Sequence, residues 1–264
     1  MQGFDSRFVA AVLGGALTPV SLVAQIDYRN LDDRRPSKVA DAYPIERFAF
    51  ELSIPYRISW NERFAHTVAP ELAYGIARSI AVGAQATVTP QGNPDPDGPD
   101  TRAGLWIFGN LRRETPGAPA ISFRLDWSAP LDVGGLSRSS LSLTGLGTRS
   151  IGRSRVHLNA GWRVASPNDP SLVSEGDWWL GVAVDHTLFR TSTLVVADLV
   201  LARTPMERNL ALDAEVGLRR QLAPTLVLAA GVGRSWEPGE QRTEVTVGLS
   251  HAFAIAGLMR GRVR

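Results

Sequence analysis

The sequence has no cysteine among its 264 residues, and lysine occurs only once. The missing thiols exclude a disulfide framework and a thiolate metal site. Basic and acidic side chains nearly balance, with 28 Lys plus Arg against 26 Asp plus Glu and a net charge of +2. No face or helix collects the arginines, so nucleic acid is not an expected partner. The four histidines show no ligand spacing and no glycine-rich phosphate loop precedes a helix, so we expect no metal and no cofactor.

Long apolar runs are also scarce. Only 8–24 approaches a membrane helix, as an uncharged stretch that contains Pro19, follows Arg7 and ends in small residues. This pattern predicts a signal peptide over 1–24, with Ala24 as a cleavage position, rather than a membrane span. A buried helix or an uncleaved anchor is the alternative. An exported chain without cysteine is not harmed by an oxidising compartment.

Beyond residue 45 the dominant pattern is strict alternation. Phe50 and Leu52 alternate with Glu51 and Ser53, and similar runs recur to Phe253. One face carries Phe, Leu, Val, Ile and Trp, whereas the other is mostly Gly, Ala, Ser and Thr with scattered charges. Small residues suit the concave inner wall of a closed barrel, and the apolar face suits lipid. We predict an all-β fold: a closed antiparallel transmembrane β-barrel of about 12 strands.

This fold divides the chain into parts with different environments. We expect a periplasmic N-terminal leader over 25–45, the barrel over 46–253 and a short basic C-terminal tail over 254–264. Long connections at 89–102, 128–138 and 165–177 alternate with short ones at 77–79, 147–153 and 220–224. Long outer loops and short periplasmic turns are typical of such barrels. The expected location is the outer membrane, reached through the periplasm, with outer-membrane lipid around a monomeric or weakly oligomeric barrel.

The same alternation places charged side chains on the predicted lumen face. The candidates are Glu51, Glu71, Arg112, Arg124, Asp126, His157, Arg163, Asp185, Asp198, Asp213, Glu215, Arg219 and Glu244. One interpretation is a lattice of arginine–carboxylate pairs that holds the wall rigid. The other is a constriction that selects permeants, in which the excess of carboxylates would favour cations or neutral polar solutes.

The last predicted strand carries an assembly pattern. Apolar or aromatic residues occupy alternate positions up to a strand-end aromatic, namely Val245, Val247, Leu249, His251 and Phe253. Outer-membrane barrels resemble one another in this signal for the barrel assembly machinery, although here the tail 254–264 follows the aromatic. With the segments Arg35–Leu52, 70–75 and 226–253, the chain resembles the outer-membrane "transporter" barrels similar to meta-pathway phenol-degradation proteins. That resemblance implies passive passage of a small-molecule solute, apolar or aromatic in character.

Two alternatives stay open. A barrel-borne lipid hydrolase could use His157 and Asn159, which share a face, with Ser140 or Ser142 on an adjoining strand, but no motif marks a nucleophile. The pair Asp185–His186 is not a candidate dyad, because neighbours on a strand point to opposite faces. The second alternative is a secreted, soluble β-protein without a transport role.

Overall fold

The computed structural model describes residues 26–31, 36–61, 64–89, 100–131, 139–165, 177–203 and 210–255. The predicted signal peptide over 1–24 and most of the predicted tail, 256–264, lie outside the described residues. The strands are β1 (Ala49–Trp60), β2 (Phe64–Val68), β3 (Glu71–Ala77), β4 (Ile80–Thr89), β5 (Asp100–Arg112), β6 (Ala120–Pro130), β7 (Ser140–Ile151), β8 (Ser154–Ala165), β9 (Asp177–Leu188), β10 (Thr193–Arg203), β11 (Leu210–Ala223), β12 (Leu226–Glu237) and β13 (Glu240–Ala254). In the described part of the chain, no helix is long and apolar enough to cross a membrane.

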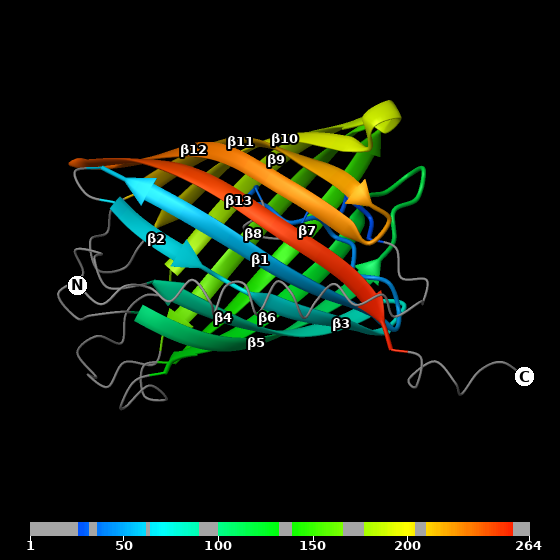
Figure 1. The fold of residues 1–264 in the computed structure, drawn as a ribbon, viewed down its shortest axis with the longest axis horizontal. Coiled ribbons are helices and arrows are strands. Elements are labelled where there is room, and N and C mark those ends of the chain that lie inside the picture. The colour runs from blue at the N-terminus through cyan, green and yellow to red at the C-terminus, as the bar shows by residue number, and fades with distance from the viewer. Residues whose placement is uncertain are drawn as a thin grey trace, which may run out of the picture.

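The strands form one closed antiparallel sheet (Figure 1). Each wall strand pairs with its neighbours in chain order. The last strand, β13, closes the barrel by pairing with the whole length of β1, from Ala49 opposite Ala254 to Trp60 opposite Thr243. Both β2 and β3 pair between β1 and β4, so they form one wall strand that is interrupted at Pro70. The 13 segments therefore make the twelve-stranded barrel that the alternation predicts. A proline has no N–H to donate to a ladder, which accounts for the interruption.

The two faces of the wall differ in polarity as the sequence predicts. Leu105, Leu158 and Val216 point outward and are 58%, 54% and 50% exposed. Inward neighbours of two of them, His157 beside Leu158 and Glu215 beside Val216, are buried and polar. Successive side chains on a strand point to opposite faces, so this division follows directly from the alternation. The barrel thus has an apolar outer belt and a polar interior.

The links between strands differ at the two ends of the barrel. Every link of more than seven residues lies at one end, which we call the long-loop end, and these links are 90–99, 131–139 and 166–176. The opposite, short-turn end carries the links 78–79, 113–119, 152–153, 189–192 and 224–225. Long and short links therefore largely alternate along the chain, as the sequence predicts.

Residues 26–31 and 36–45, which we call the inner segment, lie inside the barrel in its short-turn half (Figure 1). The N–H of Ile26 donates to the carbonyl of Pro224 at 3.0 Å, and Val39 is fully buried. A Cβ at Gly217 would stand 2.4 Å from Cγ of Pro36, so only glycine lets the segment approach the wall there. These residues belong to the stretch 25–45 that the sequence predicts as a periplasmic leader, and their small and polar side chains match the polar interior of the barrel.

Candidate functional site

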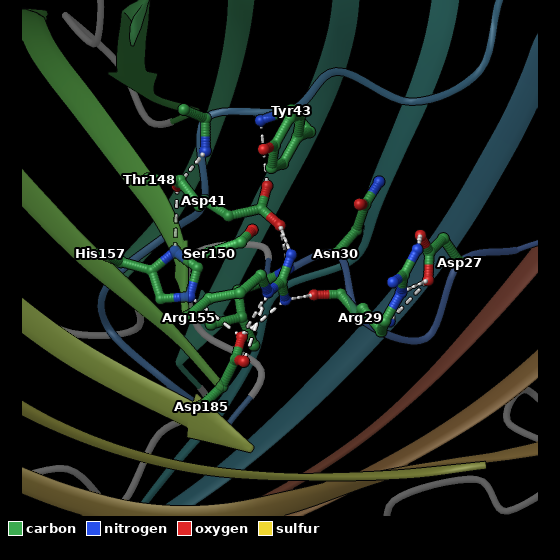
Figure 2. A network of polar contacts seen from close by, with 12 residues as sticks. Asp27, Arg29, Asn30, Asp41, Tyr43, Thr148, Ser150, Arg155, His157 and Asp185 are labelled. Atoms are coloured by element: carbon green, nitrogen blue, oxygen red, sulfur yellow. Dashed lines mark hydrogen bonds and ion pairs between the residues drawn. The ribbon is translucent and has the colours of Figure 1, made fainter. Parts of the chain in front are cut away.

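Arg155 joins the wall to the inner segment near the short-turn end (Figure 2). From β8 its guanidinium reaches Asp185 of β9 at 2.6 Å and Asp41 of the inner segment at 3.1 Å. It also donates to the carbonyl of Arg29. Asp41 and Asp185 are 2% and 0% exposed. A buried carboxylate is costly unless it is paired, so one arginine stabilises two charges from different parts of the fold.

His157 extends this network, which we call the Arg155 cluster. Its Nε2 lies 2.9 Å from Asp185, and its Nδ1 lies 3.0 Å from the hydroxyl of Thr148. A carboxylate only accepts hydrogen bonds, so Nε2 carries a proton and donates to Asp185, while Nδ1 shares a hydrogen bond with the Thr148 hydroxyl. That hydroxyl also accepts the N–H of Ala42 at 2.9 Å. The chain of hydrogen bonds therefore ends on the inner segment.

A second cluster, centred on Lys38, fixes the next part of the inner segment. Asp198 of β10 accepts hydrogen bonds from the Ser37 hydroxyl at 2.6 Å and from the N–H of Lys38 at 2.7 Å. The ammonium of Lys38 lies 3.1 Å from Asp213 and 3.3 Å from Glu244. Three of the wall carboxylates predicted to pair with wall arginines, Asp198, Asp213 and Glu244, thus contact the inner segment.

Arg57 of β1 shares the acidic side of this Lys38 cluster. Its guanidinium lies 3.3 Å from Glu244 and 3.7 Å from Glu215. Arg219 of β11 donates to the carbonyl of Asn30. Positive groups from the inner segment and from the wall therefore interleave with the carboxylates, which limits repulsion among the acidic side chains.

Tyr43 ties the inner segment to the link 113–119 outside the strands. Its hydroxyl donates to Glu114 at 2.8 Å, and Glu114 also accepts the N–H and the hydroxyl of Ser150, each at 2.7 Å. Burial and the Glu114 carboxylate raise the pKa of Tyr43 to about 12. Burial alone would raise the pKa of Glu114, but the hydrogen bonds from Ser150 and Tyr43 outweigh it and lower that pKa.

A cavity of about 670 Å³ lies between the inner segment and the long-loop end. Lys38 and Ala40 of the inner segment form part of its lining. The wall contributes Pro55, Arg57, Thr67, Ala69, Gln85, Thr87, Arg102, Ala103, Gly104, Arg124, Asp126, Ser128, Ser140, Ser142, Thr144, Leu146, Asn159, Arg163 and Trp179. Of the described residues in this lining, five are basic and one is acidic, so the cavity differs from the carboxylate-rich constriction that is one of the two interpretations of the sequence.

Two tryptophans narrow the interior. Trp106 is 7% exposed, and the guanidinium of Arg124 lies 4.4 Å from its ring centroid. Arg124 is also paired with Asp126 at 2.9 Å and with Glu71 at 3.4 Å. A Cβ at Gly161 would fall 1.9 Å from the indole of Trp179, so glycine makes room for that ring.

All the predicted lumen residues except Arg112 lie on the inner side of the wall. These are Glu51, Glu71, Arg124, Asp126, His157, Arg163, Asp185, Asp198, Asp213, Glu215, Arg219 and Glu244. A β-bulge between Asn110 and Arg112 changes the phase of β5. Asn110 stays inside and donates to the carbonyl of Ala42, whereas Arg112 is exposed and lies opposite Ile121 of the outer face.

Sequence reasoning missed four residues that carry the two clusters: Lys38, Asp41, Arg57 and Arg155. Strand alternation could have identified the two wall arginines. Arg57 is an even number of residues from Glu51, and Arg155 is an even number from His157, so each arginine shares a face with a predicted lumen residue. The two residues of the inner segment had no such signal, because that segment has no strand periodicity. In the described part of the chain, no group of three or more His, Asp or Glu side chains could hold a metal ion.

The predicted assembly residues of β13 lie on the outer face of the strand. Val245, Val247, Leu249, His251 and Phe253 alternate with buried inner residues up to Ala254. The ring of Phe253 stacks on Phe50 of β1 with centroids 5.3 Å apart, where the barrel closes. Recognition of this strand by the assembly machinery stays a prediction.

Comparison with solved structures places this architecture among outer-membrane barrels. An outer membrane channel from Pseudomonas putida matches with a TM-score of 0.62 and 11% identity, covering 81% of this chain and 98% of the other. The KdgM porin matches with a TM-score of 0.55 and 12% identity, covering 76% and 99%. The translocator domain of the autotransporter NalP from Neisseria meningitidis matches with a TM-score of 0.50 and 10% identity, covering 94% of each chain.

Sequence comparison gives no corresponding match, because neither a family model nor a curated protein matches the chain. At these low identities the structural likeness concerns the fold. The chain therefore has the closed barrel fold of outer-membrane proteins, among them channels and porins.

Proposed function

We propose that this protein is an outer-membrane channel through which small solutes pass without energy input, and that the inner segment restricts the passage at the short-turn end. The observation that carries the proposal is the division of polarity across the wall. Leucine and valine side chains of the strands are exposed outward, while carboxylates, hydroxyls and basic groups are turned inward. A barrel of that kind satisfies its backbone hydrogen bonds in lipid and encloses a polar path.

The apolar outer belt argues against a secreted, soluble protein. Leu105, Leu143, Leu158 and Leu199, from four different strands, are each at least half exposed. Soluble monomers rarely expose a continuous apolar patch larger than a few hundred Å². Outer-membrane lipid around this belt, and the barrel assembly machinery acting on β13, are the partners that the proposal implies.

The cavity supports passage of small polar solutes. Its volume of about 670 Å³ is within the range of sites that hold small molecules. Hydroxyl, amide and basic side chains dominate its lining, whereas Leu146 and Trp179 are its only large apolar side chains among the described residues. This lining favours a polar solute over the apolar or aromatic one implied by the resemblance to meta-pathway proteins.

One observation bears on the alternative of a lipid hydrolase. Thr148, His157 and Asp185 are arranged like a hydroxyl nucleophile, a base and an orienting carboxylate. However, Thr148 is 1% exposed and its hydroxyl already accepts the N–H of Ala42, so a lipid ester has no access to it. A structural role in the Arg155 cluster accounts for the three residues better than catalysis does.

Swelling of liposomes that contain the purified full chain tests the proposal. With sorbitol as the solute, we expect faster swelling than in protein-free liposomes and still faster swelling with Arg155→Gln, which loosens the inner segment. Folding of each variant is checked by the heat-dependent shift of barrel migration on a gel. Swelling no faster than in protein-free liposomes for both proteins contradicts the channel. Release of fatty acid that His157→Ala abolishes would support the hydrolase instead.

A further inference from the structure

The charges that line the cavity are strongly unbalanced. Among the described residues, its basic groups are Lys38, Arg57, Arg102, Arg124 and Arg163, and its one acidic lining residue is Asp126. The carboxylates of the Lys38 cluster, with which Lys38 and Arg57 pair, are not part of this lining. A solute in the cavity therefore meets guanidinium and ammonium groups ahead of carboxylates.

Two of these arginines have no carboxylate partner among the described side chains. Arg102 of β5 donates to the hydroxyl of Ser128 at 3.4 Å. Arg163 of β8 lies 5.9 Å from the ring centroid of Trp179. Arg124, in contrast, is neutralised by Asp126 and Glu71. Arg102 and Arg163 are therefore the basic groups most available to a solute.

Serine hydroxyls lie between these two arginines along the wall. Strand register places Ser128 opposite Ser140, and Ser142 opposite Arg163. The hydroxyls of Ser128 and Ser140 are 2.9 Å apart. Arg102, Ser128, Ser140, Ser142 and Arg163 thus form a row across β5, β6, β7 and β8, which we call the Arg–Ser row.

We infer that the Arg–Ser row makes the cavity selective for small organic anions, above all hydroxylated carboxylates. This inference rests on the proposed channel function and names its solute class. A guanidinium presents a planar pair of donors that matches a carboxylate, and the serine hydroxyls can bond the hydroxyls of the same solute. A cleft lined by one sign of charge also raises the local concentration of the opposite ion. Cations of the same size are repelled.

Three solutes with the same six-carbon backbone separate charge from size: gluconate, sorbitol and protonated N-methylglucamine. Each is measured by tracer exchange in liposomes holding the full chain, with equal concentrations on both sides so that no net charge moves. Gluconate exchange is expected to exceed sorbitol exchange by about tenfold, with N-methylglucamine slowest. Molar salt shortens the screening length to about 3 Å and should reduce the preference.

Substitutions test whether the Arg–Ser row causes the preference for gluconate over sorbitol. Arg102→Gln with Arg163→Gln is expected to bring gluconate exchange down to about the sorbitol rate while sorbitol exchange is unchanged. Arg112→Gln is the matched control, because Arg112 lies outside the lumen. If the double variant fails the gel-shift test for folding, the two single variants take its place.

The outcomes test the channel function and the anion preference separately. If no solute exchanges above the protein-free rate, the channel function itself fails. If sorbitol or N-methylglucamine exchanges as fast as gluconate, the channel stands and the anion preference is wrong. If the preference survives removal of both arginines, its assignment to the Arg–Ser row is wrong.

Discussion

Replacing Arg155 with glutamine is expected to release the inner segment from the wall. Arg155 is the cation that pairs with both Asp41 and Asp185, which are 2% and 0% exposed. Without it, two buried carboxylates lose a charged partner.

The size of the effect follows from the burial of this pair. Removing one partner of a buried ion pair costs about 3–5 kcal/mol. Since about 1.4 kcal/mol is a factor of ten, the undocked population of the inner segment should rise by about two orders of magnitude or more. The lower end of the range applies, because the side chain of Arg155 keeps 11% exposure.

The absence of native cysteine makes this population easy to measure. In the variant Ala42→Cys, the only thiol replaces a side chain that is 0% exposed in the docked state. When docking and undocking are fast, the rate of maleimide labelling follows the undocked fraction. The labelling rate should therefore rise about a hundredfold when Arg155→Gln is added.

Arg220→Gln is the matched control, because Arg220 is exposed and is next to the inward-facing Arg219 in β11. It should leave the labelling rate unchanged. A labelling rate in Arg155→Gln within threefold of the parent, in a barrel that still shows its gel shift, would refute the idea that this ion pair holds the segment.

Two further predictions concern the wall and the short-turn end. Leu158→Arg places a charge on the outer belt and should destabilise the folded barrel by about 2–4 kcal/mol if the site lies near the bilayer midplane, measured as the urea midpoint in liposomes. The pKa of Glu114 is lowered from its ordinary value of 4.5. Its hydrogen bonds with Ser150 and Tyr43 therefore stabilise the fold above pH 4.5, and this stabilisation is lost as the pH falls through the pKa that Glu114 has in the folded protein. The difference in urea midpoint between the parent and Glu114→Gln should therefore be present at neutral pH and disappear in acid.

Each of these has a clear contrary result. Equal urea midpoints for Leu158→Arg and the parent would mean that the outer face does not meet lipid. A Glu114→Gln difference that persists undiminished in acid would mean that the carboxylate charge is not what stabilises the link.

The wall could be predicted from the sequence because one physical rule governs it. A strand with lipid on one side and a polar lumen on the other must alternate, so the parity of Glu51, Asp198 and Glu244 fixed their side of the wall. Alternation placed Arg112 on the wrong face, because a bulge adds one residue to β5 and shifts the alternation for the residues that follow it. Pro70 interrupts pairing within a wall strand, yet the register continues beyond it.

The clusters could not be predicted in the same way. Pairing of Lys38 with Asp213 and Glu244, and of Asp41 with Arg155, depends on the path of an irregular segment. That path is set by tertiary contacts, such as the fit of Pro36 against glycines, and not by any repeat in the sequence. The charge of the cavity was also misjudged, because the inner segment and the wall around it bind carboxylates that otherwise would have faced the solute.

The position of the inner segment has a consequence for the order of folding. Ser37 bonds Asp198 across 161 residues of chain, and Ala42 bonds Thr148 across 106. These contacts cannot form before β7 and β10 exist, although the segment precedes every strand in the chain. The earliest part of the described chain therefore reaches its final place late, and it must enter the barrel either before β1 meets β13 or through an open end afterwards.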